Sequence, residues 1–125
     1  MANTTVKIKN KVRGDDIPII RRYVDLPEGD PVIKARLTVK TNTSTADPGI
    51  FQLTINTTEQ PSGVIEDGTT PEVLLTFVIS KTNSLLMSAT ITYLYDIQVD
   101  TQGGRTYTCE KGTIKLEEQV TQAAG

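Results

Sequence analysis

The sequence predicts an all-β protein, built as a single antiparallel β-sandwich of about seven or eight strands. Short segments carry apolar side chains at every second position, which is the period of a half-buried strand. Turn-forming residues separate these segments at intervals of roughly 10 to 18 residues. No segment shows the 3.6-residue period of an amphipathic helix, so we expect sheets packed on sheets.

The predicted sandwich is organised around the segment from Ser88 to Glu118. We expect one long strand here, then a hairpin turn at Gly103-Gly104, because glycine adopts positive φ without a steric penalty. A return strand through Tyr107 and Cys109 follows, then a second turn at residues 110–112 and a closing strand with Ile114 and Leu116 inward. The side chains expected on the inner face of the long strand are Ala89, Ile91, Tyr93, Tyr95, Ile97 and Val99.

The upstream strands are expected at Thr5–Val12, Ile17–Tyr23, Val32–Lys40 and residues 51–56. Thr5–Val12 alternates apolar residues with lysines, which is typical of a strand near a sheet edge. Pro18 cannot donate a hydrogen bond, so Ile17–Tyr23 is expected to be an edge strand or the entry to a strand. The inner face of the third strand is predicted to carry Ile33, Ala35, Leu37 and Val39.

Residues 57–71 form the longest stretch without a strand pattern, and long loops of this kind are often functional. One interpretation is a contact loop with Val64 and Ile65 as its apolar tip. The other is a connector in which these two residues cap the core. Residues 72–80 are almost continuously apolar, which predicts a central strand or one covered by a partner subunit. Residues 81–86 are expected to form a turn with a short helical twist.

The domain organisation follows from the length of 125 residues, which suits one hydrophobic core. We expect a sandwich domain over residues 1–120 and a flexible tail over residues 121–125. The chain has one cysteine and no tryptophan, so the Cys-Trp-Cys core of antibody domains is missing. The expected sandwich is therefore described only as immunoglobulin-like or jelly-roll-like.

Composition and charge restrict the possible partners. The net charge of −2 argues against a nucleic-acid partner, which would require a basic surface. No window approaches the roughly 18 apolar residues of a membrane helix, so no membrane association is expected. The first ten residues lack the apolar region of a secretion signal, which predicts synthesis in the cytoplasm.

No catalytic, cofactor or metal site is expected. Histidine is absent, so Cys109 lacks the usual base that activates a nucleophile and is expected to be a small buried side chain. Zinc sites need several cysteines or histidines. The acidic residues near positions 15–16 and 25–30 do not have the spacing of a known calcium loop.

One segment resembles a known family. Residues 92–121, TYLYDIQVDTQGGRTYTCEKGTIKLEEQVT, look like the end of a β-sandwich domain found in tailed-phage virion proteins. The shared pattern is an aromatic strand ending in YDIQV, a glycine turn, a Tyr-Thr strand and a lone glycine before the last strand. The segments DLPEGDPVIKARLTVK and EVLLTFVIS fit loosely. The pattern is similar to the N-terminal domain of phage baseplate upper proteins and to small phage head and tail proteins.

This resemblance implies a non-enzymatic bacteriophage virion structural protein, made in the cytoplasm of the host bacterium and located in the virion. The preferred role is a capsid cement or decoration protein on the lattice of the major capsid protein, and the alternative is a tail, baseplate or fibre adaptor. A carbohydrate-binding or adhesive β-sandwich ranks lower, because Trp is absent and Tyr93 and Tyr95 are expected in the core. Partners would be phage capsid or tail proteins, with a homo-oligomer, taken as a trimer. The candidate interface residues are Val64, Ile65, Leu74, Val78 and Leu94.

Overall fold

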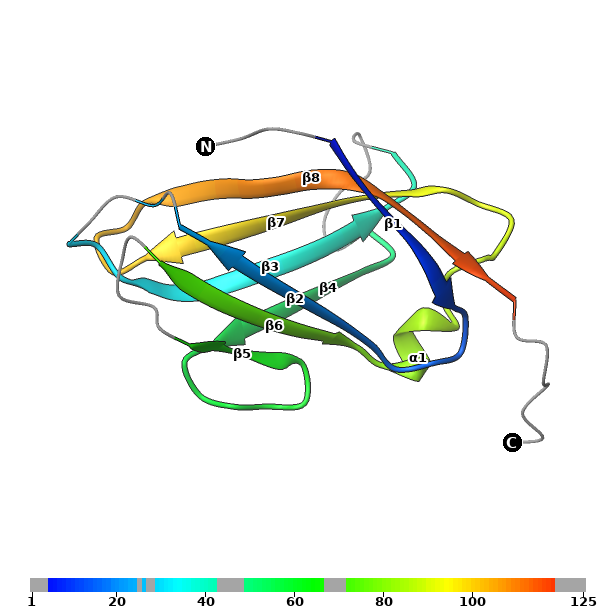
Figure 1. Cartoon of the computed structure of the whole chain (residues 1–125), viewed down its shortest axis with the longest axis horizontal. Helices are drawn as coiled ribbons and strands as arrows, with labels where there is room; N and C mark the ends of the chain where they lie inside the picture. Colours follow the sequence, from blue (N-terminus) through cyan, green and yellow to red (C-terminus); the bar gives the residue numbers. More distant parts are fainter. Residues whose placement is uncertain (1–4, 25, 27–28, 43–48, 67–71, 119–125) are drawn as a thin grey trace.

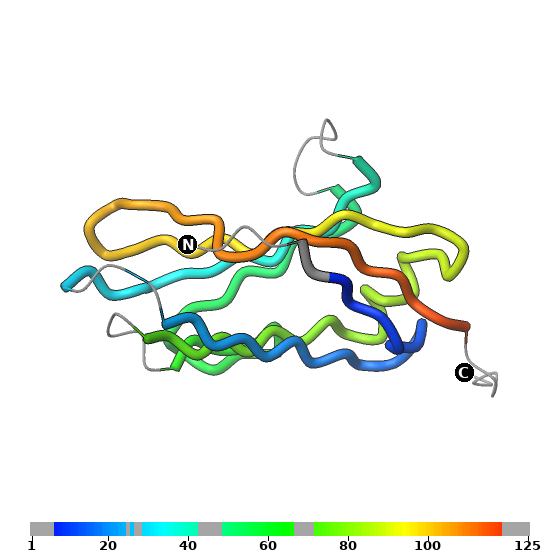
Figure 2. Tube along the Cα trace, turned by 45° about the horizontal axis from the view of Figure 1, so that its top comes forward, coloured from blue at the N-terminus to red at the C-terminus, as the bar shows by residue number. Residues whose placement is uncertain are grey.

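The computed structural model describes residues 5–24, 26, 29–42, 49–66 and 72–118, and these residues form two β-sheets. Within these ranges the chain makes eight strands and one single-turn helix, α1 (Lys81–Ser84). The sheets lie as two layers in Figure 2, with β2 and β6 in one layer and β7 and β8 in the other. The predicted all-β sandwich and the short helical twist after residue 80 are both confirmed.

The larger sheet has five strands in the order β1-β8-β7-β3-β4. Its pairings are antiparallel except at one edge, where β1 runs parallel to the end of β8 (Figure 1). The edge position expected for the first strand is therefore confirmed. The bounds of the strands are Thr5–Val12 for β1, Val32–Lys40 for β3, Phe51–Asn56 for β4, Tyr93–Thr101 for β7 and Thr106–Glu117 for β8.

The smaller sheet has three strands in the order β2-β6-β5, with bounds Ile17–Tyr23, Val73–Ile79 and Gly63–Glu66. The apolar strand β6 is central, as one of the two interpretations of residues 72–80 predicted. The strand β2, which carries Pro18, lies at the edge. Between the sheets, alternate side chains interlock to form one core. Its largest fully buried side chains are Ile17, Val32, Leu37, Val39, Ile55, Leu75, Phe77, Ile79, Met87, Ile97, Ile114 and Leu116.

The start of β3 differs from the prediction because the strand carries one extra residue opposite β7. Val32 pairs with Thr101, but Lys34 already pairs with Asp100. Such a bulge shifts the alternation by one position. Val32 is therefore buried and Ile33 is 47% exposed, so the predicted inward position of Ile33 is wrong.

The long strand predicted to begin near Ala89 also begins later in the structure than predicted. Regular pairing in β7 starts at Tyr93, and residues 88–92 belong to the connection from α1. Ala89 is half-buried and Ile91 is exposed, so the prediction that both face the core is wrong. The apolar alternation in the sequence extends upstream of Tyr93, where no neighbouring strand pairs with the chain.

The second turn predicted at residues 110–112 is also wrong, since β8 runs through these residues without a break. In β8, Thr108 pairs with Gln98 and Glu110 pairs with Ile97, which leaves Cys109 as the extra residue of a bulge. After this bulge, the residues of β8 that face the core are shifted by one position. As a result Glu110 faces the core, and Cys109 is buried beside it as predicted.

The fourth difference lies within residues 57–71, where β5 pairs with β6. Ile65 is only 3% exposed and belongs to the core, whereas the half-buried Val64 alternates to the outer face of the sheet. Neither the apolar loop tip nor the connector in which both residues cap the core therefore describes this segment. A Cβ on Gly63 would lie 1.8 Å from the carbonyl oxygen of Thr76. Only glycine therefore permits β5 to approach β6 this closely.

The domain boundary predicted at residue 120 lies outside the described residues, as does the predicted tail at residues 121–125. The strands that the structure describes run from Thr5 to Glu117 and share one core.

One buried carboxylate joins the connection before β3 to the β7–β8 hairpin. Asp30 accepts hydrogen bonds from the Thr101 hydroxyl at 2.6 Å and from the Gly103 backbone N–H at 2.7 Å, and it lies 3.4 Å from the Arg105 guanidinium. The hydrogen bond from Thr101 is the main reason that the pKa of Asp30 is lowered; the Gly103 N–H and the Arg105 charge add to it, while burial opposes it. The predicted hairpin turn is confirmed, with Gly104 at a φ of 83°.

Replacing the Asp30 carboxylate should make the stability of the fold change less between neutral and acidic pH. A carboxylate whose pKa is lower in the folded protein stabilises it above the unfolded pKa of about 4, and this contribution is lost as the pH falls. Asp30→Asn should therefore lower the melting temperature at pH 7, and its difference from the wild type should shrink at pH 2.5. Circular dichroism melts at both pH values measure this. Glu59→Gln, at an exposed acid, is the control, and an Asp30→Asn deficit of equal size at both pH values would contradict the charge-based explanation.

Candidate functional site

The main candidate site is the exposed connection between α1 and β7, residues 85–91, which we call the leucine loop. Of the six large apolar side chains that are exposed among the described residues, three lie here: Leu85 at 48%, Leu86 at 56% and Ile91 at 42%. Met87, between them, is only 1% exposed and anchors the loop in the core. The short helix begins at Ser80, whose hydroxyl caps it by accepting a hydrogen bond from the Asn83 N–H.

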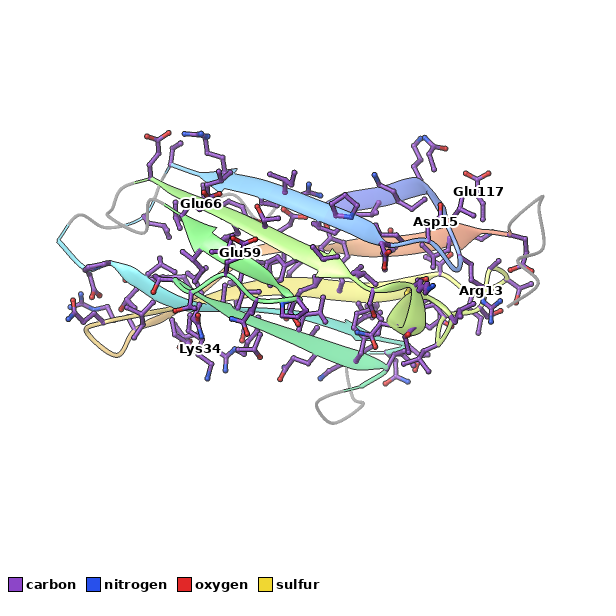
Figure 3. The ribbon with its side chains drawn as sticks, turned by 90° about the horizontal axis from the view of Figure 1, so that it is seen from below. Arg13, Asp15, Lys34, Glu59, Glu66 and Glu117 are labelled. Atoms are coloured by element: carbon purple, nitrogen blue, oxygen red, sulfur yellow. The ribbon has the colours of Figure 1, made fainter. Side chains whose placement is uncertain are left out.

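Arg13 holds the leucine loop from one side. Its Nε donates to the carbonyl oxygen of Met87 at 2.7 Å, and its Nη2 donates to that of Leu85 at 2.9 Å. Next to it, the Ser84 hydroxyl accepts from the Gly14 N–H and donates to the Asp15 carbonyl oxygen. The turn between β1 and β2 is thus bound to α1, and Figure 3 shows Arg13 and Asp15 together at this end of the molecule.

Tyr93 holds the leucine loop from the other side. Its ring is 3% exposed, and its hydroxyl accepts a hydrogen bond of 2.7 Å from the backbone N–H of Ser88. A tyrosine that begins a strand and binds the backbone a few residues upstream is the tyrosine corner of immunoglobulin-type sandwiches. The loop backbone is therefore held at Leu85, Met87 and Ser88, while the side chains of Leu85 and Leu86 are exposed.

A groove of about 340 Å³ runs along this loop. Leu85, Leu86 and Met87 contribute apolar wall, and Arg13 and Glu118 lie at its rim with 3.8 Å between their charged atoms. An apolar centre with a polar rim is the usual anatomy of a protein interface. Because the loop is already ordered, a partner that binds it would lose less conformational entropy than on a flexible loop.

Removing the Tyr93 hydroxyl should destabilise the fold that presents the leucine loop. Tyr93→Phe leaves the Ser88 N–H without its partner, which costs about 1–3 kcal/mol in the free energy of unfolding. Urea titration followed by circular dichroism measures this loss. Tyr107→Phe is the matched control, because the half-buried Tyr107 makes no hydroxyl hydrogen bond to the described residues and should change stability by less than about 0.5 kcal/mol. Equal losses in the two variants would contradict the role of the corner.

The second candidate is a buried polar cluster around Glu110, which is 7% exposed. Its Oε1 accepts from Arg21 Nε and from the Tyr23 hydroxyl, each at 2.8 Å, and its Oε2 accepts from the Tyr95 hydroxyl. The cluster joins β2 of one sheet to β7 and β8 of the other. Sequence reasoning missed it, because Glu110 was assigned to a turn.

The electrostatics of this cluster favour an ion pair and neutral phenols. Burial, followed by the charge of Glu110, raises the pKa of Tyr23. Burial and the hydrogen bond to Glu110 raise the pKa of Tyr95. Burial opposes the charge of Arg21, but its interaction with Glu110 outweighs this and raises the pKa of the guanidinium. Both oxygens of Glu110 are occupied by donors, so the geometry suits a structural link between the sheets.

The thiol of Cys109 is subject to the same environment. Burial, and after it the charge of Glu110, raises its pKa to about 12. Thiolates are the reactive form of cysteine, so this environment suppresses nucleophilic chemistry. The hypothesis of a catalytic Cys109, already disfavoured by the absence of histidine, gains no support from this geometry.

Cys109 should therefore react slowly with alkylating reagents. At pH 8, iodoacetamide should modify the native thiol at least about a hundredfold more slowly than in denaturing urea, because the native thiol is 5% exposed and its raised pKa leaves far less thiolate. Intact-protein mass spectrometry over time measures the single adduct. In a Cys109→Ser background, Lys115→Cys places a thiol at an exposed position of the same strand and is the control. Similar native rates at the two positions would contradict the burial of the thiol.

The outer face of the five-stranded sheet carries a third feature, a polar groove of about 490 Å³. Lys40, Asp96, Lys111 and Thr113 contribute to its lining, and Leu94 is its one large aliphatic side chain. The side chains of Tyr93 and Tyr95 are buried on the other face, as predicted. Tyr95 contributes to the lining of the groove, but its side chain is only 4% exposed, so it offers no open ring face on which a sugar could stack.

The five predicted interface residues do not form one surface. Ile65 belongs to the core, so its predicted place in an interface is wrong. Val64, Leu74 and Val78 share the outer face of the three-stranded sheet, and Leu94 lies on the outer face of the other sheet. Leu85 and Leu86 were missed as exposed residues. The available signal was an adjacent pair of leucines in a segment that was itself predicted to be a turn.

The described residues contain no group of three or more Cys, Asp or Glu side chains placed to hold a metal ion. In the same part of the chain, no helix has the length and apolar character needed to cross a membrane.

The strand order, the parallel β1–β8 pair and the tyrosine corner before β7 together define an immunoglobulin-like β-sandwich. No protein-family model matches the sequence, and no curated protein matches it. Among solved structures, the extracellular portion of mouse CD200RLa is similar, with a TM-score of 0.41 and 9% sequence identity over 94% of this chain. The chain spans 57% of the length of that structure.

Proposed function

We propose that the protein is a non-enzymatic structural component of a tailed-phage virion, which docks onto another virion protein through the leucine loop. The observation that carries this proposal is the pair of exposed leucines on a backbone that Arg13 and Tyr93 hold in place. Buried aliphatic anchors in a preformed site contribute much of the energy of protein interfaces.

The virion setting is supported by the sequence pattern of residues 92–121, which resembles phage β-sandwich domains. The described part of that segment, residues 92–118, contains the corner tyrosine Tyr93, the β7–β8 hairpin and the long β8 strand. Within this setting, the preferred role is a capsid cement or decoration protein that binds the lattice of the major capsid protein. The alternative role is a tail, baseplate or fibre adaptor. Both roles require docking to a protein surface and neither requires catalysis.

A carbohydrate-binding role is the remaining alternative, and the polar groove on the outer face of the five-stranded sheet is the feature that favours it. A glycan array separates this role from protein docking. A specific glycan signal that is lost with Lys111→Ala and Asp96→Ala would favour the groove, whereas loss with leucine-loop variants would not.

The docking role is tested on particles of the source phage that lack the protein. Purified wild-type protein should co-sediment with such particles, and immunogold labelling should place it on the head lattice for a decoration protein or on the tail for an adaptor. The double substitution Leu85→Ser/Leu86→Ser should weaken co-sedimentation at least about tenfold, because each lost leucine contact is worth about 1–2 kcal/mol.

Ile33→Ser is the matched control, because Ile33 is similarly exposed but lies at the start of β3, at the opposite end of the molecule from α1 (Figure 1). This variant should bind as the wild type does. Melting temperatures verify that all variants are folded. Failure of the wild-type protein to bind any part of the particle would overturn the proposal.

A further inference from the structure

A second apolar surface, left uncovered by the residues that the structure describes, lies on the outer face of the three-stranded sheet and does not include the leucine loop. Side chains that alternate away from the core form this outer face. Ile20, at 57% exposed, is the most exposed of its large apolar members. The outer face comprises Pro18, Ile20 and Arg22 on β2, Leu74, Thr76 and Val78 on β6, and Val64 and Glu66 on β5.

On the outer face, opposite charges lie on the two strands that flank β6. In one row of the sheet, Leu74 pairs with Arg22 on one side and with Glu66 on the other. A cation on one edge strand and an anion on the other therefore lie at the same height along the strands. In the next row, Thr76 pairs in the same way with Ile20 and Val64, which gives apolar side chains on both edges.

We propose that two copies of this chain pack their outer faces against each other about a twofold axis parallel to β6. Such an axis places β2 of each copy over β5 of the other and preserves the height along the strands. Arg22 then faces Glu66 of the second copy, and Ile20 faces Val64 of the second copy. Each of these contacts occurs twice by symmetry, and the occupant of the face is thus a second copy of the chain.

The charge pattern selects this axis over the other twofold axis in the plane of the sheet. An axis perpendicular to the strands would place β2 over β2 and β5 over β5 of the second copy, so that neither Arg22 nor Glu66 would meet its opposite charge. The axis along β6 is also compatible with aligned packing of sheets about 10 Å apart, with the usual angle of about −30° between strands.

The existing ion pair of Arg22 does not conflict with this arrangement. Arg22 Nη1 lies 2.6 Å from the Glu72 carboxylate, but both side chains are more than half exposed. A guanidinium presents five N–H donors, so Arg22 has donors left for Glu66 of the second copy. The single pair within the chain would become part of a small network across the interface.

The size of the outer face sets the expected strength of association. Three strands about 4.8 Å apart and seven residues of about 3.4 Å rise cover about 14 by 24 Å. This lies below the roughly 800 Å² per partner of a standard stable interface. The dimer should therefore be weak, with a dissociation constant in the micromolar range or above. The proposed assembly is a dimer, whereas the expectation from the sequence was a trimer.

Light scattering after size-exclusion chromatography, run from about 5 μM to 1 mM, is the experiment. The wild-type protein should rise from the 13.6 kDa protomer mass towards twice that value. Arg22→Glu and Glu66→Arg should each raise the dissociation constant at least about tenfold, since each places like charges opposite one another twice. The double variant Arg22→Glu/Glu66→Arg should restore dimerisation, because it exchanges the charges and keeps the axis.

Two controls make the result specific. Lys115→Glu changes an exposed charge on the other sheet and should leave the dissociation constant unchanged. Leu85→Ser/Leu86→Ser should also dimerise as the wild type, because the leucine loop lies outside the outer face; failure of the docking proposal is thus distinguishable from failure of this one. A wild-type protein that stays monomeric at 1 mM, or a double variant that does not recover, would overturn the proposal.

Discussion

The phase of the side-chain alternation in each strand is the constraint on which the rest of this structure depends. A strand presents alternate side chains to opposite faces, so one inserted residue exchanges the inner and outer sets. The extra residue at Ile33 brings Val32 into the core and leaves Ile33 exposed, and the extra residue at Cys109 shifts the alternation in the remainder of β8. The second bulge turns Glu110 inward, to the place where Arg21, Tyr23 and Tyr95 surround it.

The Glu110 cluster takes the structural place of a disulfide. In antibody domains, a cysteine two residues after the corner tyrosine bonds to the opposite sheet. Here that position carries Tyr95, which reaches Glu110, and Glu110 in turn reaches Arg21 and Tyr23 on β2. Buried ion pairs contribute modestly to net stability, but losing one partner is costly. The cluster therefore fixes how the two sheets align more than it adds to their free energy of association.

The two proposed binding surfaces differ in how the fold creates them. In the leucine loop, Arg13 and Tyr93 make hydrogen bonds to backbone groups, and the side chains of Leu85 and Leu86 stay outside the core. The outer face of the three-stranded sheet is exposed because a sandwich covers only the inner face of each sheet. One surface lies at an end of the molecule and the other on its flat side, so docking to a virion protein and self-association are geometrically compatible.

The sequence by itself determined the fold class, the edge position of β1 and the hairpin at Gly103-Gly104. It narrowed β2 to an edge strand or a strand entry, and β6 to a central strand or one covered by a partner subunit. Alternation, Pro18 and the glycine pair are local signals, and local signals suffice when a strand is regular. The tertiary structure alone decided the inward turn of Glu110, the exposure of Ile33 and the formation of β5. These depend on which residue of a neighbouring strand lies opposite, and that register is absent from the order of residues along one strand. The leucine loop likewise required the tertiary structure, because its tether to Arg13 spans more than seventy residues of sequence.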